Sequence, residues 1–334
     1  MSRIEIALAS DANYFCGIFV TACSIVKSCK SDVELRFNVL DGGIDDRDWT
    51  LLVGKLDELC RAKTSAHTTV SFNRIRVDTD EFGDCPSWNG SRMIYAHLLL
   101  PRLLPEAGWC VYCDGDFLWY RDIAELWQQR LRDDRLLFIG VLDPAEAVRK
   151  SDEAWCRERG YDCPADEYCC AGLSFVNLKA FRNEGLQDKV WEMNALHPPM
   201  NDQTIFNSVC SGRKLVLSEH WQCFSRRLTP EVMREGVVIH YAGAIPWKRT
   251  SWILNPLTDA TMLWHRENAE FCGISVWQSL RRWFPIGYIL WHRGIYWLAQ
   301  VPGVKWGLKA LCAMTGHLGV WQLFEANTRR VWEN

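Results

Sequence analysis

Two aspartates one residue apart, Asp114 and Asp116, have the type and spacing to bind a divalent cation. They directly follow the apolar run Trp109–Cys113, which predicts a buried strand. Ligands of open α/β sheets bind at the carboxyl ends of strands, so both carboxylates lie where chemistry is expected. A cation there can bridge a diphosphate and neutralise the charge that develops on a departing nucleoside diphosphate. Because isolated Asp-x-Asp triplets also occur on solvated turns, the prediction depends on the segments that accompany this one.

Two polar segments at the edges of predicted elements suit the same chemistry. Asp11 follows the first predicted strand and can hold a base or a ribose, and Tyr14 can stack on a uracil ring. Asp202 and Gln203 open a predicted helix after a Pro-Pro turn, which places polar side chains at the edge of that element. Either aspartate could instead cap its helix, since Asp favours such positions.

A further segment begins at His240, after a late predicted strand. A neutral imidazole there can complete a metal site with the two aspartates, although a satisfied core histidine is the alternative. Gly243 allows the backbone to approach a phosphate closely. Lys248, next to Trp247, adds a cation for the same phosphate charge.

The elements that must position these residues alternate between strand and helix patterns. This alternation favours an α/β fold with a mostly parallel, doubly wound sheet flanked by helices. The predicted strands are Ile4–Ala9, Leu35–Leu40, Val70–Val77, Trp109–Cys113, Leu136–Leu142, Gly172–Val176 and Val237–His240. The predicted helices are Ile18–Ser28, Asp48–Leu59 and Ser91–Leu104.

Composition limits the class of protein. The chain has 334 residues, 48% of them hydrophobic, which is enough to bury a substantial core. Its net charge of -3 argues against a nucleic-acid partner. The 15 cysteines are odd in number and irregularly spaced, and no secretory leader is recognised, which predicts a reducing compartment. A metal site formed by Cys156, Cys163, Cys169 and Cys170 is an alternative use of some of them, but these lack the two tightly spaced pairs of structural zinc sites.

The composition changes from about Ser275 onwards. Seven basic residues and two acidic ones accompany seven tryptophans in this stretch. The basic residues are Arg281, Arg282, Arg293, Lys305, Lys309, Arg329 and Arg330; the acidic residues are Glu325 and Glu333; the tryptophans are Trp277, Trp283, Trp291, Trp297, Trp306, Trp321 and Trp332. Apolar runs here are too short to span a bilayer, whereas tryptophan mixed with basic residues suits an anionic headgroup region. We therefore predict a catalytic domain over residues 1–260 and a helical, membrane-associating region over residues 261–334; packing of the tryptophans onto the core is the alternative.

Together and in this order, the segments resemble glycosyltransferase family 8, the retaining transferases of the GT-A fold. The resemblance covers roughly Arg3 to Lys248. It includes the segments Tyr95–Pro101 and Ala171–Leu178, the Asp-Gln pair at residue 202 and the His-Tyr-x-Gly motif at His240. It implies a GT-A catalytic domain that uses a UDP-sugar.

The resemblance also implies a role for each matching residue. Asp114, Asp116 and His240 would ligate Mn²⁺, with Mg²⁺ as the alternative. The implied donor-binding residues are Ala9, Asp11, Asn13, Tyr14, His97, Gly115, Asp143, Cys170, Ala171, Gly172, Gly243, Trp247 and Lys248. The implied catalytic residues are Gln203 and Asp202, with Gln203 acting as a nucleophile or as a stabiliser of an oxocarbenium-like transition state. Since an amide is a poor nucleophile, we favour stabilisation, with attack on the same face and retention of configuration.

Three departures from the family pattern concern the donor. His97 stands where relatives usually carry Arg, and Cys170 stands where they carry Asn or Gly. After Gly243 the chain reaches Pro-Trp without the usual preceding lysine, and Lys248 follows the tryptophan instead. Donor identity therefore stays open between UDP-galactose, UDP-glucose and another UDP-sugar.

The resulting interpretation is a hexosyltransferase that acts on a saccharide acceptor, expected to be lipid-linked, in lipopolysaccharide, lipooligosaccharide or capsule synthesis. It is expected in the cytoplasm, peripheral on the inner face of the cytoplasmic membrane. Three alternatives remain: a degenerate GT-A fold that serves as a binding or scaffold module, a haloacid-dehalogenase-like phosphatase, and a transferase with a protein acceptor. The phosphatase usually places its Asp-x-Asp motif near the N-terminus and follows it with a small or hydroxyl residue, unlike Phe117–Trp119 here.

Overall fold

The computed structural model describes residues 2–64, 67–88, 90–249 and 257–314, together with Trp321, Glu325 and Val331. The chain divides into two compact units. The first comprises Met1–Gly115 and Arg121–Gln222, and the second comprises Asp116–Tyr120 and Cys223–Asn334. The functional boundary predicted between residues 260 and 261 stays a prediction; both residues lie within one helix of the second unit.

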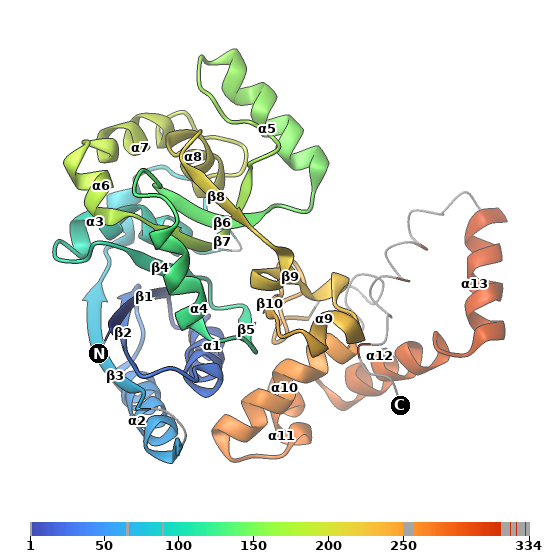
Figure 1. Ribbon diagram of the computed structural model, residues 1–334. Coiled ribbons are helices and arrows are strands. Elements are labelled where there is room, and N and C mark those ends of the chain that lie inside the picture. Colours follow the sequence, from blue (N-terminus) through green and yellow to red (C-terminus); the bar gives the residue numbers. More distant parts are fainter. Residues whose placement is uncertain are drawn as a thin grey trace. The chain divides into compact units, whose positions relative to one another are not determined.

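The first unit contains a seven-stranded sheet in the order β3-β2-β1-β4-β7-β6-β8 (Figure 1). The strands are β1 (Ser2–Ser10), β2 (Val33–Asp41), β3 (Thr69–Arg76), β4 (Cys110–Cys113), β6 (Phe138–Leu142), β7 (Cys169–Val176) and β8 (Lys214–Leu217). In this sheet β7 runs antiparallel to its neighbours β4 and β6, and the other neighbouring strands pair in parallel. This is the mostly parallel α/β sheet that the sequence predicts.

Helices accompany this sheet. They are α1 (Phe15–Ser28), α2 (Asp46–Ala62), α3 (Leu100–Leu103), α4 (Ile123–Gln128), α5 (Glu146–Glu158), α6 (Leu178–Asn183), α7 (Leu186–Asn194) and α8 (Asp202–Val209), with 3₁₀ turns at Thr79–Phe82, Met93–Leu99, Gln129–Leu131 and Glu219–Trp221. Helix α1 is apolar and largely buried, as expected for a helix packed between a sheet and another helix. Helix α2 begins at a capped end, where Asp45 accepts a hydrogen bond from the Asp48 N–H.

The helix predicted over Ser91–Leu104 is largely a 3₁₀ helix, Met93–Leu99, followed by the short α3. Pro101 interrupts α-helical bonding at the end of this segment, because it has no N–H to donate to the carbonyl of His97. That carbonyl instead accepts from Leu100, which is 3₁₀ spacing. The segment remains well buried, and Tyr95, Leu98 and Leu99 contribute to the core of the first unit.

The second unit contains a three-stranded sheet in the order β5-β10-β9. Its elements are β5 (Phe117–Trp119), β9 (Cys223–Phe224), β10 (Val238–His240), α9 (Pro230–Arg234), α10 (Asp259–Cys272), α11 (Val276–Trp283), α12 (Ile286–Leu298), α13 (Pro302–Met314) and a 3₁₀ turn at Ser225–Arg227. The C-terminal stretch is therefore helical as far as Met314, as predicted. Arg329, Arg330, Trp332 and Glu333 lie outside the described residues.

Two observations concern the cysteines and the apolar character of the helices. All 15 cysteines are present as free thiols. Among the helices that the structure describes, none has the length and apolar character needed to cross a bilayer.

Candidate metal and donor-sugar site

Asp114 directly follows the carboxyl end of β4, and contacts with β4 and β7 fix its position. Its backbone N–H donates to the Gly172 carbonyl of β7 at 2.8 Å. Its Oδ1 accepts a 2.7 Å hydrogen bond from the Tyr112 hydroxyl. Burial, assisted by the Asp114 charge, raises the pKa of Tyr112 well above its usual value, so the phenol stays a donor. Sequence reasoning missed Tyr112; its position two residues before Asp114, on the same face of a strand, was the available signal.

Gly115 joins the two aspartates at a place where a side chain would not fit. A Cβ on Gly115 would lie 2.9 Å from Ile18 Cγ2 and 3.0 Å from the Ile18 backbone nitrogen. The Thr21 hydroxyl donates to the Gly115 carbonyl at 2.9 Å. Helix α1 thus packs directly on this glycine and fixes its carbonyl.

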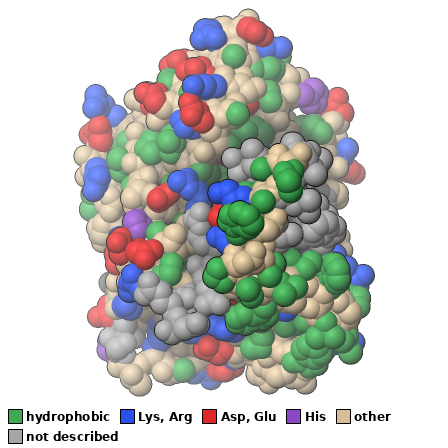
Figure 2. Space-filling model, turned by 90° about the vertical axis from the view of Figure 1, so that its right-hand side faces the viewer, with side chains coloured by type: hydrophobic (Ala, Val, Ile, Leu, Met, Phe, Trp, Pro, Cys, Tyr) green, Lys and Arg blue, Asp and Glu red, His purple; other side chains and the backbone are tan. Residues whose placement is uncertain are grey.

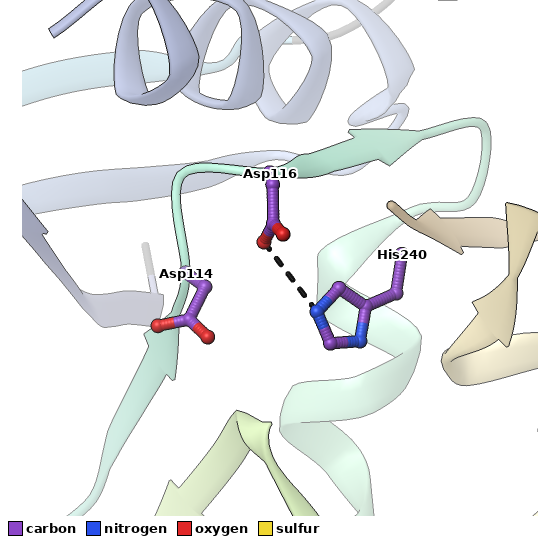
Figure 3. Close-up of side chains that lie close together, drawn as sticks. All are labelled: Asp114, Asp116 and His240. Atoms are coloured by element: carbon purple, nitrogen blue, oxygen red, sulfur yellow. Dashed lines mark ion pairs between the residues drawn. The ribbon is translucent and has the colours of Figure 1, made fainter. Parts of the chain in front are cut away.

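Asp116 and His240 are brought together by strand pairing. Strand β10 pairs antiparallel with β5, with His240 opposite Phe117, and the Tyr241 N–H donates to the Asp116 carbonyl at 2.9 Å. The His240 ring stacks on Phe117 at 4.2 Å between ring centroids and meets the edge of Phe224 at 5.1 Å. Its Nε2 lies 3.4 Å from Asp116 Oδ1, so the imidazole is held facing the carboxylate (Figure 3).

Asp114, Asp116 and His240 offer three ligand atoms that all lie within 4.8 Å of one another. Asp116 Oδ1 is buried and accepts no hydrogen bond from any described residue. A buried carboxylate oxygen without a donor is costly unless a cation compensates it. Two carboxylates and one imidazole therefore fit a divalent cation such as Mn²⁺ or Mg²⁺. The cysteines considered as alternative ligands form no such group among the described residues.

Gln203, in the first turn of α8, is held by two other predicted site residues. Its Oε1 accepts a hydrogen bond from the Ala171 N–H of β7 at 3.0 Å. Its Nε2 donates to Asp143 Oδ2 at 3.0 Å. The other oxygen of Asp143 accepts from the Ala145 N–H at 2.8 Å. The structure thus joins Gln203, Ala171 and Asp143, all buried, into one hydrogen-bonded group.

His97 and Asp202 form a second pair. The His97 ring lies between Tyr112, 4.2 Å away, and Phe206, 5.0 Å away, measured between ring centroids. Its Nε2 is 3.4 Å from Asp202 Oδ2, but neither ring nitrogen makes a hydrogen bond to a described residue. Burial lowers the pKa of His97 to about 3. Burial, followed by the Asp114 charge, raises the pKa of Asp202 well above its usual range. A neutral imidazole therefore occupies the position where relatives usually carry a cation.

The remaining predicted donor-binding residues are held by local contacts. Asp11 Oδ1 accepts from the backbone N–H groups of Asn13 at 2.9 Å and Tyr14 at 3.2 Å, an Asx turn before α1. Asn13 is exposed, whereas Ala9 and Tyr14 are half-buried. Their predicted contact with uridine stays a prediction.

In the second unit, Gly243 is exposed and has a φ of 68°, a conformation that favours glycine. Trp247 is buried and packs on Trp264 at 5.0 Å between ring centroids, and Lys248 is half-buried. In the first unit, Cys170 is buried on β7 opposite Val141. The Trp247 ring is thus packed in the second unit. The predicted donor contacts of Gly243, Trp247, Lys248 and Cys170 stay predictions.

Comparison with known proteins decides the family. A model of glycosyl transferase family 8 matches residues 5–251, which is most of the chain. The chain belongs to glycosyltransferase family 8. The resemblance inferred from the motifs is confirmed, the activity class is glycosyl transfer, and the phosphatase alternative is wrong.

Solved structures show the same fold for this family 8 chain. The galactosyltransferase LgtC, in complex with donor and acceptor sugar analogs, has a TM-score of 0.64 at 22% identity over 84% of this chain and 100% of its own. An active-site mutant of LgtC has a TM-score of 0.61 at 23% identity over 81% of this chain and 95% of its own. The bifunctional glycosyltransferase WbbM has a TM-score of 0.60 at 19% identity over 80% of this chain, which spans 50% of the WbbM chain. Comparison with curated protein sequences gives no significant match.

Proposed function

We propose that this family 8 chain transfers a hexose from UDP-galactose or UDP-glucose to a saccharide acceptor, with retention of configuration. The observation that carries the proposal is the group of ligand atoms from Asp114, Asp116 and His240, all within 4.8 Å of one another. A divalent cation bound there supplies a positive charge for the diphosphate of the leaving group. The similarity of the fold to that of the galactosyltransferase LgtC also supports the proposal.

The chain's own side chains prepare the site for this chemistry. Tyr112 and the Gly172 carbonyl hold Asp114 in one orientation. Phe117 and the edge of Phe224 hold the His240 ring. These contacts keep the ligand side chains near one another, which lowers the free-energy cost of assembling the site around a cation.

Gln203 is proposed as the stabiliser of positive charge on the reacting sugar. Its Oε1 accepts one hydrogen bond, from Ala171, and a carbonyl oxygen has a second lone pair. Its Nε2 donates to Asp143, which fixes the direction of the amide dipole. A fixed dipole aimed at developing charge costs no reorganisation during the reaction. Asp143 and Asp202 are proposed to bind hydroxyls of the donor sugar.

The proposed acceptor is lipid-linked, and the proposed location is the inner face of the cytoplasmic membrane. Support comes from the C-terminal helices, where Trp291, Trp297 and Trp306 are 61%, 54% and 75% exposed. Figure 2 shows hydrophobic side chains gathered on the face that carries these helices. Trp321 is instead buried and Trp283 half-buried. For these two residues, the alternative that the C-terminal tryptophans pack inside the protein fits better than membrane contact. Arg281, Arg282 and Lys309 are exposed and would attract anionic headgroups.

The test is UDP release from UDP-galactose and UDP-glucose without acceptor, with Mn²⁺ or with EDTA. We expect slow release from one donor, lost with EDTA and in Asp116→Asn, which keeps the shape of the side chain but removes its charge. Asp134→Asn, at an exposed position, is the matched control and should behave like wild type. If neither donor is hydrolysed and neither raises the Tm with Mn²⁺, transfer from UDP-galactose or UDP-glucose is wrong. If a wider panel of UDP-sugars gives the same result, the degenerate binding module replaces it.

A further inference from the structure

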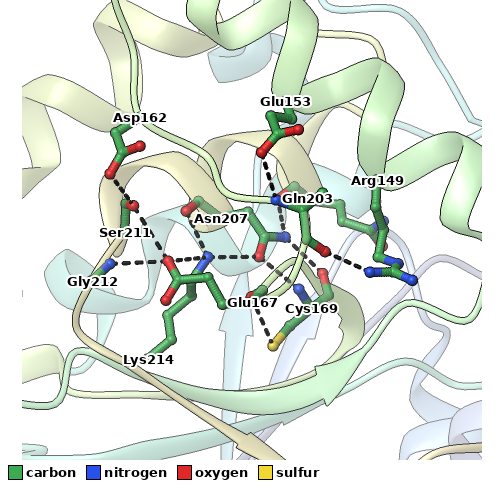
Figure 4. A network of polar contacts seen from close by, with 11 residues as sticks. Arg149, Glu153, Asp162, Glu167, Cys169, Gln203, Asn207, Ser211, Gly212 and Lys214 are labelled. Carbon is green, nitrogen blue, oxygen red and sulfur yellow. Dashed lines mark hydrogen bonds and ion pairs between the residues drawn. The ribbon is translucent and has the colours of Figure 1, made fainter.

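A lysine with no exposed side-chain surface lies at the start of β8. Lys214 Nζ donates to the Asn207 carbonyl at 2.9 Å and to Asn207 Oδ1 at 3.2 Å. It also lies 3.2 Å from Glu167 Oε1, while its own side chain is 0% exposed (Figure 4). Burying an ammonium group costs free energy unless it is fully paired. An apolar residue at this strand position would be buried without the desolvation free energy of an ammonium group. Packing alone therefore does not account for a lysine here.

Its main partner, Asn207, uses every donor and acceptor of its side chain. Asn207 Oδ1 accepts from the Cys169 N–H at 2.7 Å as well as from Lys214. Asn207 Nδ2 donates to the Cys169 carbonyl at 2.6 Å and to the Gln203 carbonyl at 2.8 Å. A reversed amide would place its NH₂ group against two donors and its oxygen against two acceptors. Lys214 therefore helps to fix a single orientation of the Asn207 amide.

The Asn207 amide connects the two elements that hold Gln203. Asn207 lies one turn after Gln203 on the same face of α8, because residues four apart are neighbours on a helix. Cys169 lies two residues before Ala171 on β7, and the Ala171 N–H donates to Gln203 Oε1. One buried amide thus ties the start of β7 to the start of α8, and the Gln203 side chain bridges the same two elements.

A second contact restrains α8 from another side. The Thr204 hydroxyl donates to Asp152 of α5, which also accepts a 2.6 Å hydrogen bond from the Tyr168 hydroxyl. The position of α8 is therefore restrained by α5 and by β7. The link through Asn207 and Lys214 reaches both the helix and the strand segment in contact with the Gln203 amide.

We propose that Lys214 and Asn207 are positioning residues that hold the Gln203 amide in its reactive orientation. The inference rests on the proposed role of Gln203 in glycosyl transfer. Neither residue touches a substrate in this scheme. Lys214 orients Asn207, Asn207 fixes β7 against α8, and these two elements set where Gln203 Oε1 points.

The test compares Lys214→Met with Arg213→Met. Methionine keeps most of the volume of lysine and removes the charge. Arg213 is the adjacent residue, and its guanidinium pairs with Glu184 outside this network, so Arg213→Met controls for loss of one positive charge. We expect Lys214→Met to lower kcat for UDP release by about 10- to 100-fold, as misplacement of a catalytic group does. KM for the donor and Kd for UDP with Mn²⁺ should change less than about twofold, because uniform binding is untouched.

A double-mutant cycle separates positioning from general stability. If Lys214 acts through Gln203, Lys214→Met should change kcat less than about twofold once Gln203→Ala is present. An equal loss of kcat in both backgrounds, or a loss no larger than that of Arg213→Met, overturns the inference while the role of Gln203 stands. Full kcat in Gln203→Ala alone overturns the proposed role of Gln203 and the inference with it. If Lys214→Met does not bind UDP with Mn²⁺, the isosteric Asn207→Asp replaces it in the cycle, because it loses the two amide donors. Its loss of kcat is then compared in the wild-type and Gln203→Ala backgrounds in the same way.

Discussion

The Tyr112 hydroxyl donates a 2.7 Å hydrogen bond to Oδ1 of Asp114, two residues further along the chain. The bond leaves one oxygen of this carboxylate oriented by the protein before any cation binds. Metal-binding side chains held by such outer partners bind their ion more tightly than unrestrained ones.

Tyr112→Phe should therefore weaken cation binding without unfolding the chain. We expect the Kd for Mn²⁺ in the presence of UDP to rise about tenfold, within the usual range for loss of an outer hydrogen bond. Calorimetric titration measures this directly. Tyr161→Phe removes the hydroxyl of a half-buried tyrosine elsewhere and should leave the Kd unchanged. Equal Kd values for both variants would show that the bond does not orient Asp114.

Gly115→Ala should disturb the site by a steric route. The new methyl group would lie 2.9 Å from Ile18 Cγ2 and 3.0 Å from a backbone nitrogen that cannot rotate away. Either α1 or the aspartate loop must move, so we expect UDP release to fall by about tenfold or more. Gly108→Ala is the control, because no atom lies within 4 Å of its Cβ position. Unchanged UDP release in Gly115→Ala would show that the loop adapts freely.

Stability should fall as the pH drops below the usual histidine range. Burial lowers the pKa of His97 to about 3 and that of His265 to about 4, the latter opposed by a hydrogen bond to the Pro246 carbonyl. In the unfolded chain both titrate near about 6.5, so below this pH the unfolded state binds more protons than the folded state. Each histidine then costs up to about 1.4 kcal/mol of unfolding free energy per pH unit, until its folded pKa is reached.

Urea unfolding at about pH 7 and about pH 5 measures this loss. In His97→Phe the ring can still pack between Tyr112 and Phe206, but the titrating group is gone. This variant should lose less stability between the two pH values than wild type does. An identical loss in both proteins would mean that His97 is already neutral in the unfolded chain or protonated in the folded one.

The exposed C-terminal tryptophans should govern binding to vesicles. Replacing Trp291, Trp297 and Trp306 by Ala should lower cosedimentation with phosphatidylglycerol vesicles by about tenfold or more, because three large apolar side chains no longer leave water. Added salt should weaken wild-type binding by screening Arg281 and Arg282. Trp88→Ala is the matched control, since Trp88 is 51% exposed in the first unit. Equal loss in the control, or no binding by wild type, would contradict the membrane proposal.

The longer elements could be predicted from the sequence because their hydrophobic patterns are unambiguous. The strands at Ile4–Ala9 and Leu35–Leu40 and the helix at Asp48–Leu59 all appear within slightly wider bounds. Among the strands of two to four residues, β4 and β10 were predicted from the apolar runs in which they lie. The short strands β5, β8 and β9 were missed because so short a segment shows no clear period. The helix predicted over Ser91–Leu104 is wrong in type for Met93–Leu99, which is a 3₁₀ helix, and Pro101 accounts only for the break before α3.

The site could be predicted only where its residues are marked by their place along the chain. Asp114 and Asp116 were recognisable because they follow an apolar strand. The roles of Asn207 and Lys214 could not be seen, since their contacts depend on which strands are neighbours in the sheet. The packing of the Trp247 ring on Trp264 could not be seen either, because the two residues belong to separate segments of the chain.

The pairing of β5 with β10 also has a consequence for how the site forms during folding. Residues of the two strands lie far apart in the sequence, so their pairing closes a long loop and loses chain entropy before any ligand atom gains a neighbour. A growing or truncated chain that ends before Val238 contains both aspartates but has no imidazole to face them. The complete set of three ligand side chains should therefore form late, after all seven strands of the first unit's sheet have been synthesised.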